Sequence, residues 1–259
     1  MGDLITMDDL TNEEILQVLD SARRLVPVAK GEVYLPLLQG KVLGNLFFEN
    51  STRTRMSFEA AMKRLGGEVL NLSSVGSSVA KGETLYDTMQ MVDGYADIAV
   101  IRHPNQGAAQ YSADAVEIPI LNGGDGAGNH PTQTMLDLFT IREAHGSLEG
   151  LNVVMVGDLR YGRTTHSLSH ALVRFGAKIT LVSPDALKMP GEIVSDLKNH
   201  GGEITETEEM SSSIDSADVI YMTRIQKERF PDEEEYLKVK GSYVAVSYTH
   251  LTLPTICSL

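Results

Sequence analysis

The stretch that decides the fold is Phe47-Phe48-Glu49-Asn50-Ser51-Thr52-Arg53-Thr54-Arg55. It changes abruptly from apolar residues to small hydroxyl residues interleaved with two arginines, and helical periodicity follows. This predicts a strand end, a tight turn and a helix N-terminus, where unpaired N–H groups and the helix dipole attract anions. The pattern indicates a phosphate site, although the stretch taken alone fits an ordinary N-cap with solvated arginines equally well.

Strands and helices alternate outward from this stretch. The segment Val42 to Phe48 precedes the turn as a strand, Gly66-Gly67 stops the helix, and Glu68 to Leu72 is the next strand. Upstream, a capping-box pattern at Thr11 begins an amphipathic helix, which we expect Pro27 to end. This alternation is typical of α/β proteins with parallel sheets.

The second half of the chain repeats the alternation. Strands are predicted at Leu151 to Val156, Lys178 to Val182 and Val219 to Met222, with a helix from Glu192 to His200. The turn-rich run 145–150 marks a domain boundary. We therefore expect an α/β fold of two doubly wound parallel-sheet domains, 1–145 and 146–246, with the active site in the cleft between them.

Two further strand ends supply polar residues. Arg102 follows a strand predicted at Asp97 to Ile101, and a strand at Val116 to Leu121 leads through a glycine-rich loop to His130 and Gln133. Carboxyl ends of parallel strands meet at one edge of a sheet, so we expect these side chains to approach the phosphate site. A histidine at a loop-to-helix junction beside an anion site is a candidate for proton transfer or hydrogen bonding to substrate.

The segment between Asn71 and Glu83 is rich in serine, includes Ser77, and is punctuated by glycines. Such a segment is either a surface connection or a lid over a ligand, and composition alone favours the connection. Lys81 supports the lid, because a lysine is a mobile point charge suited to phosphate.

Composition narrows the class of protein. The 259-residue chain is 42% hydrophobic and 22% charged, and its net charge of -13 argues against a nucleic-acid surface. No apolar run reaches the length of a membrane span, and the acidic start lacks the basic region of a signal peptide, so we expect a cytoplasmic protein. The single cysteine, Cys257, excludes an internal disulfide and a cysteine-based zinc site.

A rival interpretation rests on Gly157 to Thr164. This run follows a strand and differs by one residue from a nucleotide-binding phosphate loop, with Arg163 in place of the lysine. It ranks second because a planar guanidinium does not copy the compact lysine charge, and no clear acidic strand end offers a magnesium ligand. A non-catalytic anion-binding module is a further alternative.

Taken together, motifs spread along the chain resemble the catalytic chains of the aspartate carbamoyltransferase family. The resemblance runs from Asp8 to Val246, and the last two motifs resemble the aspartate branch rather than the ornithine branch. The motifs are Phe48-Glu-Asn-Ser-Thr-Arg-Thr-Arg55, Lys81-Gly-Glu-Thr84, Arg102-His-Pro104, His130-Pro-Thr-Gln133, Gly157-Asp-Leu-Arg-Tyr-Gly-Arg163 and Tyr221-Met-Thr-Arg-Ile-Gln226.

The resemblance implies transfer of a carbamoyl group from carbamoyl phosphate to L-aspartate, in pyrimidine synthesis, without a metal or other cofactor. It implies that domain 1–145 binds carbamoyl phosphate and domain 146–246 binds aspartate. The implied phosphate ligands are Ser51, Thr52, Arg53 and Thr54. Thr54, Arg102 and His130 would act at the carbonyl oxygen, Gln133 would orient the amide, and Arg163, Arg224 and Gln226 would bind the aspartate carboxylates.

The resemblance also implies an assembly. The family forms homotrimers with shared sites, so Ser77 and Lys81 would reach a neighbouring chain's site. Glu49 would pair with Arg163 and Arg229 to hold the two domains closed. The sequence leaves open whether a separate regulatory chain attaches.

The resemblance stops after Val246. Residues 247–259 are similar to the translation of a sequencing-library adapter, so we expect a non-native tail and an incomplete aspartate-binding domain, and no role for His250 or Cys257. Loss of a substrate loop and of the final helix would lower stability or activity.

Overall fold

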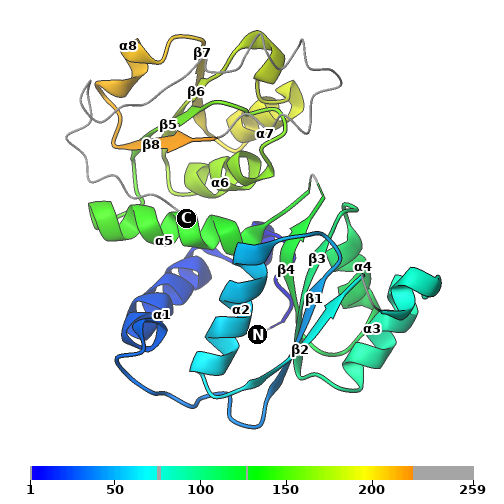
Figure 1. The fold of residues 1–259 in the computed structure, drawn as a ribbon. Coiled ribbons are helices and arrows are strands. Elements are labelled where there is room, and N and C mark those ends of the chain that lie inside the picture. The colour runs from blue at the N-terminus through cyan, green and yellow to red at the C-terminus, as the bar shows by residue number, and fades with distance from the viewer. Residues whose placement is uncertain (1, 75–76, 127, 224–259) are drawn as a thin grey trace. The chain divides into compact units, whose positions relative to one another are not determined.

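The computed structural model describes residues 2–74, 77–126 and 128–223 (Figure 1). By its internal contacts the chain divides into two compact units, Met1–Met135 and Leu136–Leu259. Each unit is built on a parallel four-stranded sheet flanked by helices, which confirms the predicted α/β class. The predicted tail at 247–259 lies outside the described residues.

The first unit has the strand order β2-β1-β3-β4. In chain order its elements are η1 (Met7–Asp9), α1 (Asn12–Lys30), β1 (Val42–Phe47), α2 (Thr52–Arg64), β2 (Glu68–Ser73), η2 (Ser78–Lys81), α3 (Leu85–Asp93), β3 (Ile98–His103), α4 (Ala108–Ala115), β4 (Ile120–Asp125) and the beginning of α5 (Pro131–His145).

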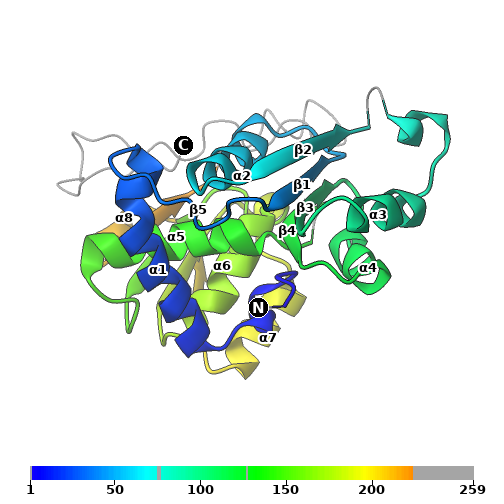
Figure 2. The same cartoon turned by 90° about the horizontal axis from the view of Figure 1, so that it is seen from below.

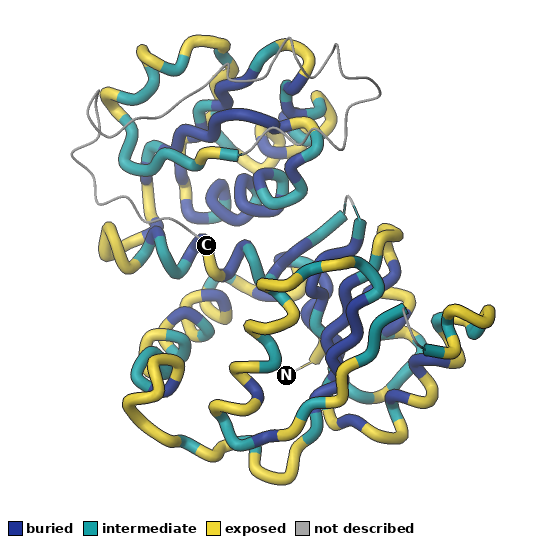
Figure 3. Tube along the Cα trace, in the orientation of Figure 1, coloured by how far each residue is buried: buried dark blue, intermediate teal, exposed yellow. Residues whose placement is uncertain are grey.

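Helices cover both faces of this sheet. Successive side chains of a strand point to opposite faces, so apolar residues of the same strand can pack against helices on either side. On one face Met62 of α2 packs with Leu43 and Phe47 of β1. On the other face Met89 of α3 packs with Leu46. Figures 1 and 2 show α2 on the opposite side of the strands from α3 and α4. Figure 3 shows the central strands buried while much of α2 is exposed.

The second unit has the strand order β7-β6-β5-β8. After the rest of α5 its elements are β5 (Asn152–Val156), α6 (Arg163–Val173), β6 (Lys178–Val182), η3 (Asp185–Leu187), α7 (Gly191–Asn199), β7 (Glu203–Thr207), α8 (Ser211–Ile214) and β8 (Val219–Met222). The valine-rich strand β5 lies in the middle of the sheet and is almost fully buried, as its continuous apolar run predicts.

The predicted end of the first helix is wrong. Helix α1 continues through Pro27 to Lys30 and ends at Gly31, which adopts a left-handed conformation with φ of 77°. The Gly31 N–H donates to a carbonyl in the last turn of the helix. Near a helix end a proline removes one backbone hydrogen bond, and the glycine provides the conformation that stops the helix.

The predicted position of the fourth strand is also shifted. β4 runs from Ile120 to Asp125 and includes glycines that we assigned to a loop. The preceding Glu117 and Ile118 donate their N–H groups to the Asp93 carboxylate, so this segment is bound to the end of α3 and not to the sheet. Similarly, Arg102 and His103 lie inside β3 and do not follow it.

Several described elements had no sequence-based prediction, among them α8 and the short helices η1, η2 and η3. β7 is a polar edge strand with little apolar signal, and α4 is a short helix of small residues. Across the described part of the chain, no helix combines the length and apolarity that a membrane crossing requires.

Candidate active site

The predicted phosphate ligands lie at the start of α2. Ser51 is the N-cap residue in an extended conformation, and its side chain makes no capping hydrogen bond. Thr52 and Arg53 are exposed in the first turn, whereas Thr54 is half-buried. The first N–H groups of a helix have no intrahelical acceptor, so this terminus offers backbone donors together with hydroxyl and guanidinium groups.

The sheet places this terminus beside Arg102. β1 and β3 are adjacent parallel strands in which Phe47 is opposite Arg102. Just past the end of β1, the Phe48 N–H donates to the Arg102 carbonyl at 2.8 Å. The turn that leads into α2 therefore starts at the same sheet edge at which Arg102 emerges, as the strand ends predict.

Arg102 is a nearly buried cation, with 8% of its surface exposed. Its Nη1 donates to the Gly123 carbonyl at 3.0 Å, and its Nη2 donates to Glu49 Oε1 at 3.0 Å. The buried Nε has no hydrogen-bond partner among the described residues. The guanidinium is thus fixed between the loop after β1 and the end of β4, and its Nε–H is still available as a donor.

Glu49 is paired with Arg102 inside the first unit. The resemblance implied pairing with Arg163 and Arg229. Arg163 belongs to the other unit and Arg229 lies outside the described residues, so that pairing remains a prediction.

Asp125 shapes the loops around Arg102 and was missed from the sequence. It is buried at the end of β4, where Oδ2 accepts the Gly107 N–H at 2.9 Å and Oδ1 accepts the Asn129 N–H at 2.6 Å. This carboxylate joins the loop after β3 to the loop that carries His130. A lone acidic residue within a glycine-rich run was the available signal.

His130 is buried immediately before α5, with 5% of its surface exposed. Its Nδ1 lies 3.3 Å from Thr132 Oγ1, and its carbonyl accepts the Gln133 N–H at 3.0 Å. When the threonine hydroxyl donates to Nδ1, the neutral ring carries its proton on Nε2, which is then a hydrogen-bond donor.

His103 neighbours Arg102 and has a structural role. Its Nδ1 accepts the Asn105 N–H at 3.0 Å, and its ring packs against Phe48 with centroids 5.4 Å apart. Burial lowers the pKa of His103, which favours the uncharged ring. It therefore adds no charge to the site at neutral pH.

Ser77 and Lys81 lie beyond the end of β2. Ser77 is the N-cap residue of η2, and its hydroxyl donates to the Ser74 carbonyl at 3.3 Å. Lys81 is the last residue of η2 and is exposed. Its charge is accessible to a ligand or to another chain.

In the second unit, Arg163 is the first residue of α6. The loop before it is held by Asp158, a buried carboxylate whose Oδ1 accepts the Tyr161 N–H at 3.0 Å. The other predicted aspartate ligands, Arg224 and Gln226, lie outside the described residues.

The geometry of this loop does not fit a phosphate loop. Gly157 adopts φ of 117°, and a Cβ there would lie 2.5 Å from the Thr223 carbonyl oxygen. The glycine is therefore required by the approach of the chain after β8. Four backbone N–H groups of this loop are bonded within the protein, so they are not directed at a phosphate. Gly157 donates to the Val182 carbonyl and Asp158 donates to the Thr223 hydroxyl. Leu159 donates to the Leu187 carbonyl and Tyr161 donates to the Asp158 carboxylate.

Two family models match the chain. The model described as "Aspartate/ornithine carbamoyltransferase, carbamoyl-P binding domain" matches residues 2–143, and the model described as "Aspartate/ornithine carbamoyltransferase, Asp/Orn binding domain" matches residues 149–252. The chain belongs to the aspartate/ornithine carbamoyltransferase family.

Similar proteins within this family are catalytic subunits of aspartate carbamoyltransferases. The one from Methanococcoides burtonii is 56% identical over 241 residues, which cover 92% of this chain and 78% of the relative. The one from Archaeoglobus fulgidus is 54% identical over 244 residues, covering 94% of this chain and 80% of the relative.

Solved structures of the family superpose well. The catalytic subunit from M. jannaschii has a TM-score of 0.87 and 51% identity, covering 94% of this chain and 80% of its own. The Trypanosoma cruzi aspartate transcarbamoylase in complex with carbamoyl phosphate and aspartate has a TM-score of 0.86 and 41% identity. The match covers 92% of this chain and 76% of the Trypanosoma cruzi chain.

Proposed function

We propose that this protein transfers the carbamoyl group of carbamoyl phosphate to the amine of L-aspartate, giving N-carbamoyl-L-aspartate and phosphate, a step of pyrimidine synthesis. Curated relatives at 51–56% identity over most of the chain are aspartate carbamoyltransferase catalytic subunits. The structural observation that carries the proposal is the buried guanidinium of Arg102 at the sheet edge where α2 begins.

In this proposal the start of α2 holds the phosphate group of the donor. Ser51, Thr52, Arg53 and Thr54 contribute hydroxyl, backbone N–H and guanidinium donors, and the helix dipole favours the negative charge. The net charge of -13 opposes binding of an anion, so these local donors have to outweigh the field of the whole protein.

Thr54, Arg102 and His130 act on the carbonyl oxygen, which becomes negative as the aspartate amine attacks. A fixed donor in a site that excludes water stabilises such charge more than solvent does. Arg102 fits this role because its position is set by Gly123 and Glu49 before substrate binds. Gln133 orients the carbamoyl amide.

Arg163, Arg224 and Gln226 bind the aspartate carboxylates, since a guanidinium can hold a carboxylate by two parallel hydrogen bonds. The aspartate-binding domain is 146–246, and the carbamoyl-phosphate-binding domain is 1–145. The departing phosphate accepts the proton of the amine, so the mechanism requires no cofactor. Orientation of the two reactants supplies about 7 to 11 kcal/mol of the barrier reduction.

The assembly is a homotrimer in the cytoplasm, in which Ser77 and Lys81 complete a neighbouring chain's site. The exposed position of Lys81 supports this arrangement. Attachment of a separate regulatory chain is compatible with it.

The proposal is tested by incubating the protein with carbamoyl phosphate and either L-aspartate or L-ornithine, and by measuring the carbamoylated product. We expect N-carbamoyl-L-aspartate from the first mixture and no citrulline from the second. Calorimetry with carbamoyl phosphate alone gives an independent readout of donor binding. Transfer to ornithine, or failure to bind carbamoyl phosphate, would contradict the proposal.

A further inference from the structure

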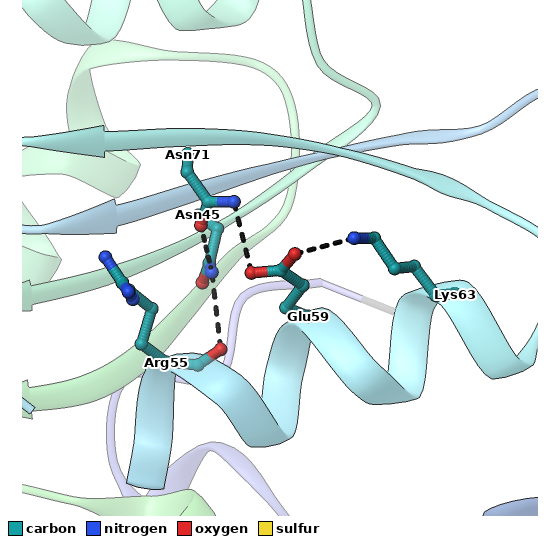
Figure 4. A network of polar contacts seen from close by, with 5 residues as sticks. All are labelled: Asn45, Arg55, Glu59, Lys63 and Asn71. Atoms are coloured by element: carbon teal, nitrogen blue, oxygen red, sulfur yellow. Dashed lines mark hydrogen bonds and ion pairs between the residues drawn. The ribbon is translucent and has the colours of Figure 1, made fainter. Parts of the chain in front are cut away.

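A chain of polar side chains joins α2 to two strands of the first sheet (Figure 4). Asn45 in β1 and Asn71 in β2 are directly opposite each other in register. Asn45 Nδ2 donates to Asn71 Oδ1 at 2.8 Å, and Asn71 Nδ2 donates to Glu59 Oε2 at 3.2 Å. Lys63 Nζ donates to Glu59 Oε1 at 2.7 Å, which completes the chain on the surface of α2.

Asn45 is an unfavourable residue for its position in terms of burial alone. It has no exposed surface, and β1 is otherwise built from apolar residues and one glycine. Its Oδ1 has no hydrogen-bond partner among residues 2–74, 77–126 and 128–223. A buried amide oxygen without a partner opposes folding. An apolar side chain carries no such cost, so the contacts of the amide nitrogen are the gain to be explained.

These contacts reach the N-terminal half of α2. Asn45 Nδ2 also lies 3.4 Å from the Arg55 carbonyl oxygen, and Glu59 follows one turn later. The fully buried apolar contact of α2 is Met62, near its other end. Thr52, Arg53 and Met56 are exposed. Phe58, in the middle of α2, is partly buried against the same cluster, so this packing and the polar chain together hold the half of α2 from which the anion donors project.

The same contacts favour the charged form of Glu59. The hydrogen bonds from Lys63 and then from Asn71 lower the pKa of the Glu59 carboxyl group. A glutamate four residues after an arginine can pair with it along the helix. Figure 4 shows the Glu59 carboxylate turned toward Asn71 and the Arg55 guanidinium pointing away from it. The negative charge is thus held on the strand β2 side of the helix.

We propose that Asn45, Asn71 and Glu59 are positioning residues for the anion site at the start of α2. They fix the axial position and rotation of the helix on the sheet, and they do not touch the substrate. The inference rests on the proposed function only in that it assigns the anion site to this helix terminus. We call this set, with Lys63, the α2 clamp.

The test compares Glu59→Ala and Asn71→Ala with Glu59→Gln, using inorganic phosphate as the probe in calorimetry. Loss of the clamp misplaces several donors at once, so we expect both alanine variants to raise the phosphate Kd about tenfold. Glu59→Gln keeps an acceptor for Asn71 and should remain within about twofold of the wild type, because an exposed ion pair such as that with Lys63 contributes little.

The matched control is Asp97→Asn. Asp97 accepts hydrogen bonds from Lys41 Nζ and the Val42 N–H at the opposite, amino end of the same sheet. This variant loses a comparable ion pair and should leave the phosphate Kd unchanged. Arg53→Ala should abolish phosphate binding. If it does and Asn71→Ala binds as the wild type does, the clamp is overturned while the proposed function stands.

Backbone hydrogen exchange measured without ligand tests the α2 clamp independently of the proposed function. We expect faster exchange in residues 52–59 of the Asn71→Ala and Glu59→Ala variants, with no change in residues 60–64. If wild-type protein fails to bind phosphate, the proposed function is contradicted and this exchange pattern still decides the clamp. Uniform acceleration across 52–64, or an equal loss of Tm with and without phosphate, would mean that the residues only stabilise the fold.

Discussion

Arg102 has two of its donor groups occupied before any substrate binds. Gly123 supplies a neutral acceptor to Nη1, and Glu49 supplies a charged acceptor to Nη2. The carbonyl contact fixes direction, because a backbone oxygen in β4 cannot move far. The carboxylate contact is different, since it neutralises the charge that the proposed mechanism requires. Gly123 thus fixes the orientation of the Arg102 guanidinium, whereas Glu49 reduces its effective positive charge.

The first prediction concerns the role of Arg102 in the transition state. We expect Arg102→Ala to lower kcat about 100-fold or more, because a donor to the developing oxyanion is lost. The KM for carbamoyl phosphate should rise much less, since the start of α2 still holds the phosphate. Steady-state kinetics with both substrates varied checks this. Equal losses in kcat and in donor binding would assign Arg102 to ground-state binding instead.

The second prediction concerns Glu49. Glu49 stands two residues before Ser51, the N-cap residue of α2, so its negative charge opposes the binding of phosphate at that terminus, by up to about 1 kcal/mol. Glu49→Gln keeps the hydrogen bond and removes the charge, so phosphate should bind about two- to fivefold more tightly. Calorimetry at low ionic strength measures the change. Weaker binding would mean that the charge on Glu49 supports the site.

The positions of some candidate site residues could be predicted from the sequence, and those of others could not. Arg102 and His130 were identifiable as candidates because each comes after an apolar run in the sequence, and the carboxyl ends of parallel strands converge at one edge of a sheet. Asn45 and Asp125 were not, because their roles depend on which segments far away in sequence lie against them. The partner of Glu49 is a tertiary contact of the same kind.

At the scale of elements, apolar runs located β1, β2, β5, β6 and β8, since these strands carry their own hydrophobic signal. The errors have two sources. α1 continues past its proline and stops only at Gly31, a local cap with a left-handed backbone, whereas β4 begins late because Asp93, a tertiary partner, binds the preceding backbone. β7 is a polar edge strand, so periodicity alone gave no signal for it.

The third prediction concerns the joining of β5 to β8. Gly157→Ala introduces a Cβ 2.5 Å from the Thr223 carbonyl at a φ of 117°, so we expect it to destabilise the fold by about 1 to 3 kcal/mol. Gly150→Ala is the matched control, because its φ of 66° is also positive and a Cβ there would meet no atom within 4 Å. Urea unfolding compares the two variants. If they lose equal stability, the close approach of Thr223 does not explain the glycine.

At the scale of the whole molecule, the proposed trimer gives the serine-rich segment around η2 a purpose. Ser77 uses its hydroxyl to hold the local chain, while Lys81 ends η2 with an exposed charge. An exposed lysine contributes little to stability, so its loss should affect activity only if an active site, in its own chain or in a neighbouring one, uses it. If sites are shared, a mixture of two different inactive variants should therefore show activity that neither variant shows alone.

The fourth prediction uses two inactive variants, Lys81→Ala and His130→Ala. In a trimer with shared sites, a site that takes His130 from one variant and Lys81 from its neighbour is complete. Random reassembly of equal amounts should make about one quarter of the sites complete, because each site samples two chains independently. Denaturing and refolding the mixture, with each variant refolded alone as the control, and then assaying carbamoyl-aspartate formation measures the recovery. Activity that stays at the level of the separate variants would place all residues of a site on one chain, and Lys81 would then have to serve the same subunit that carries His130.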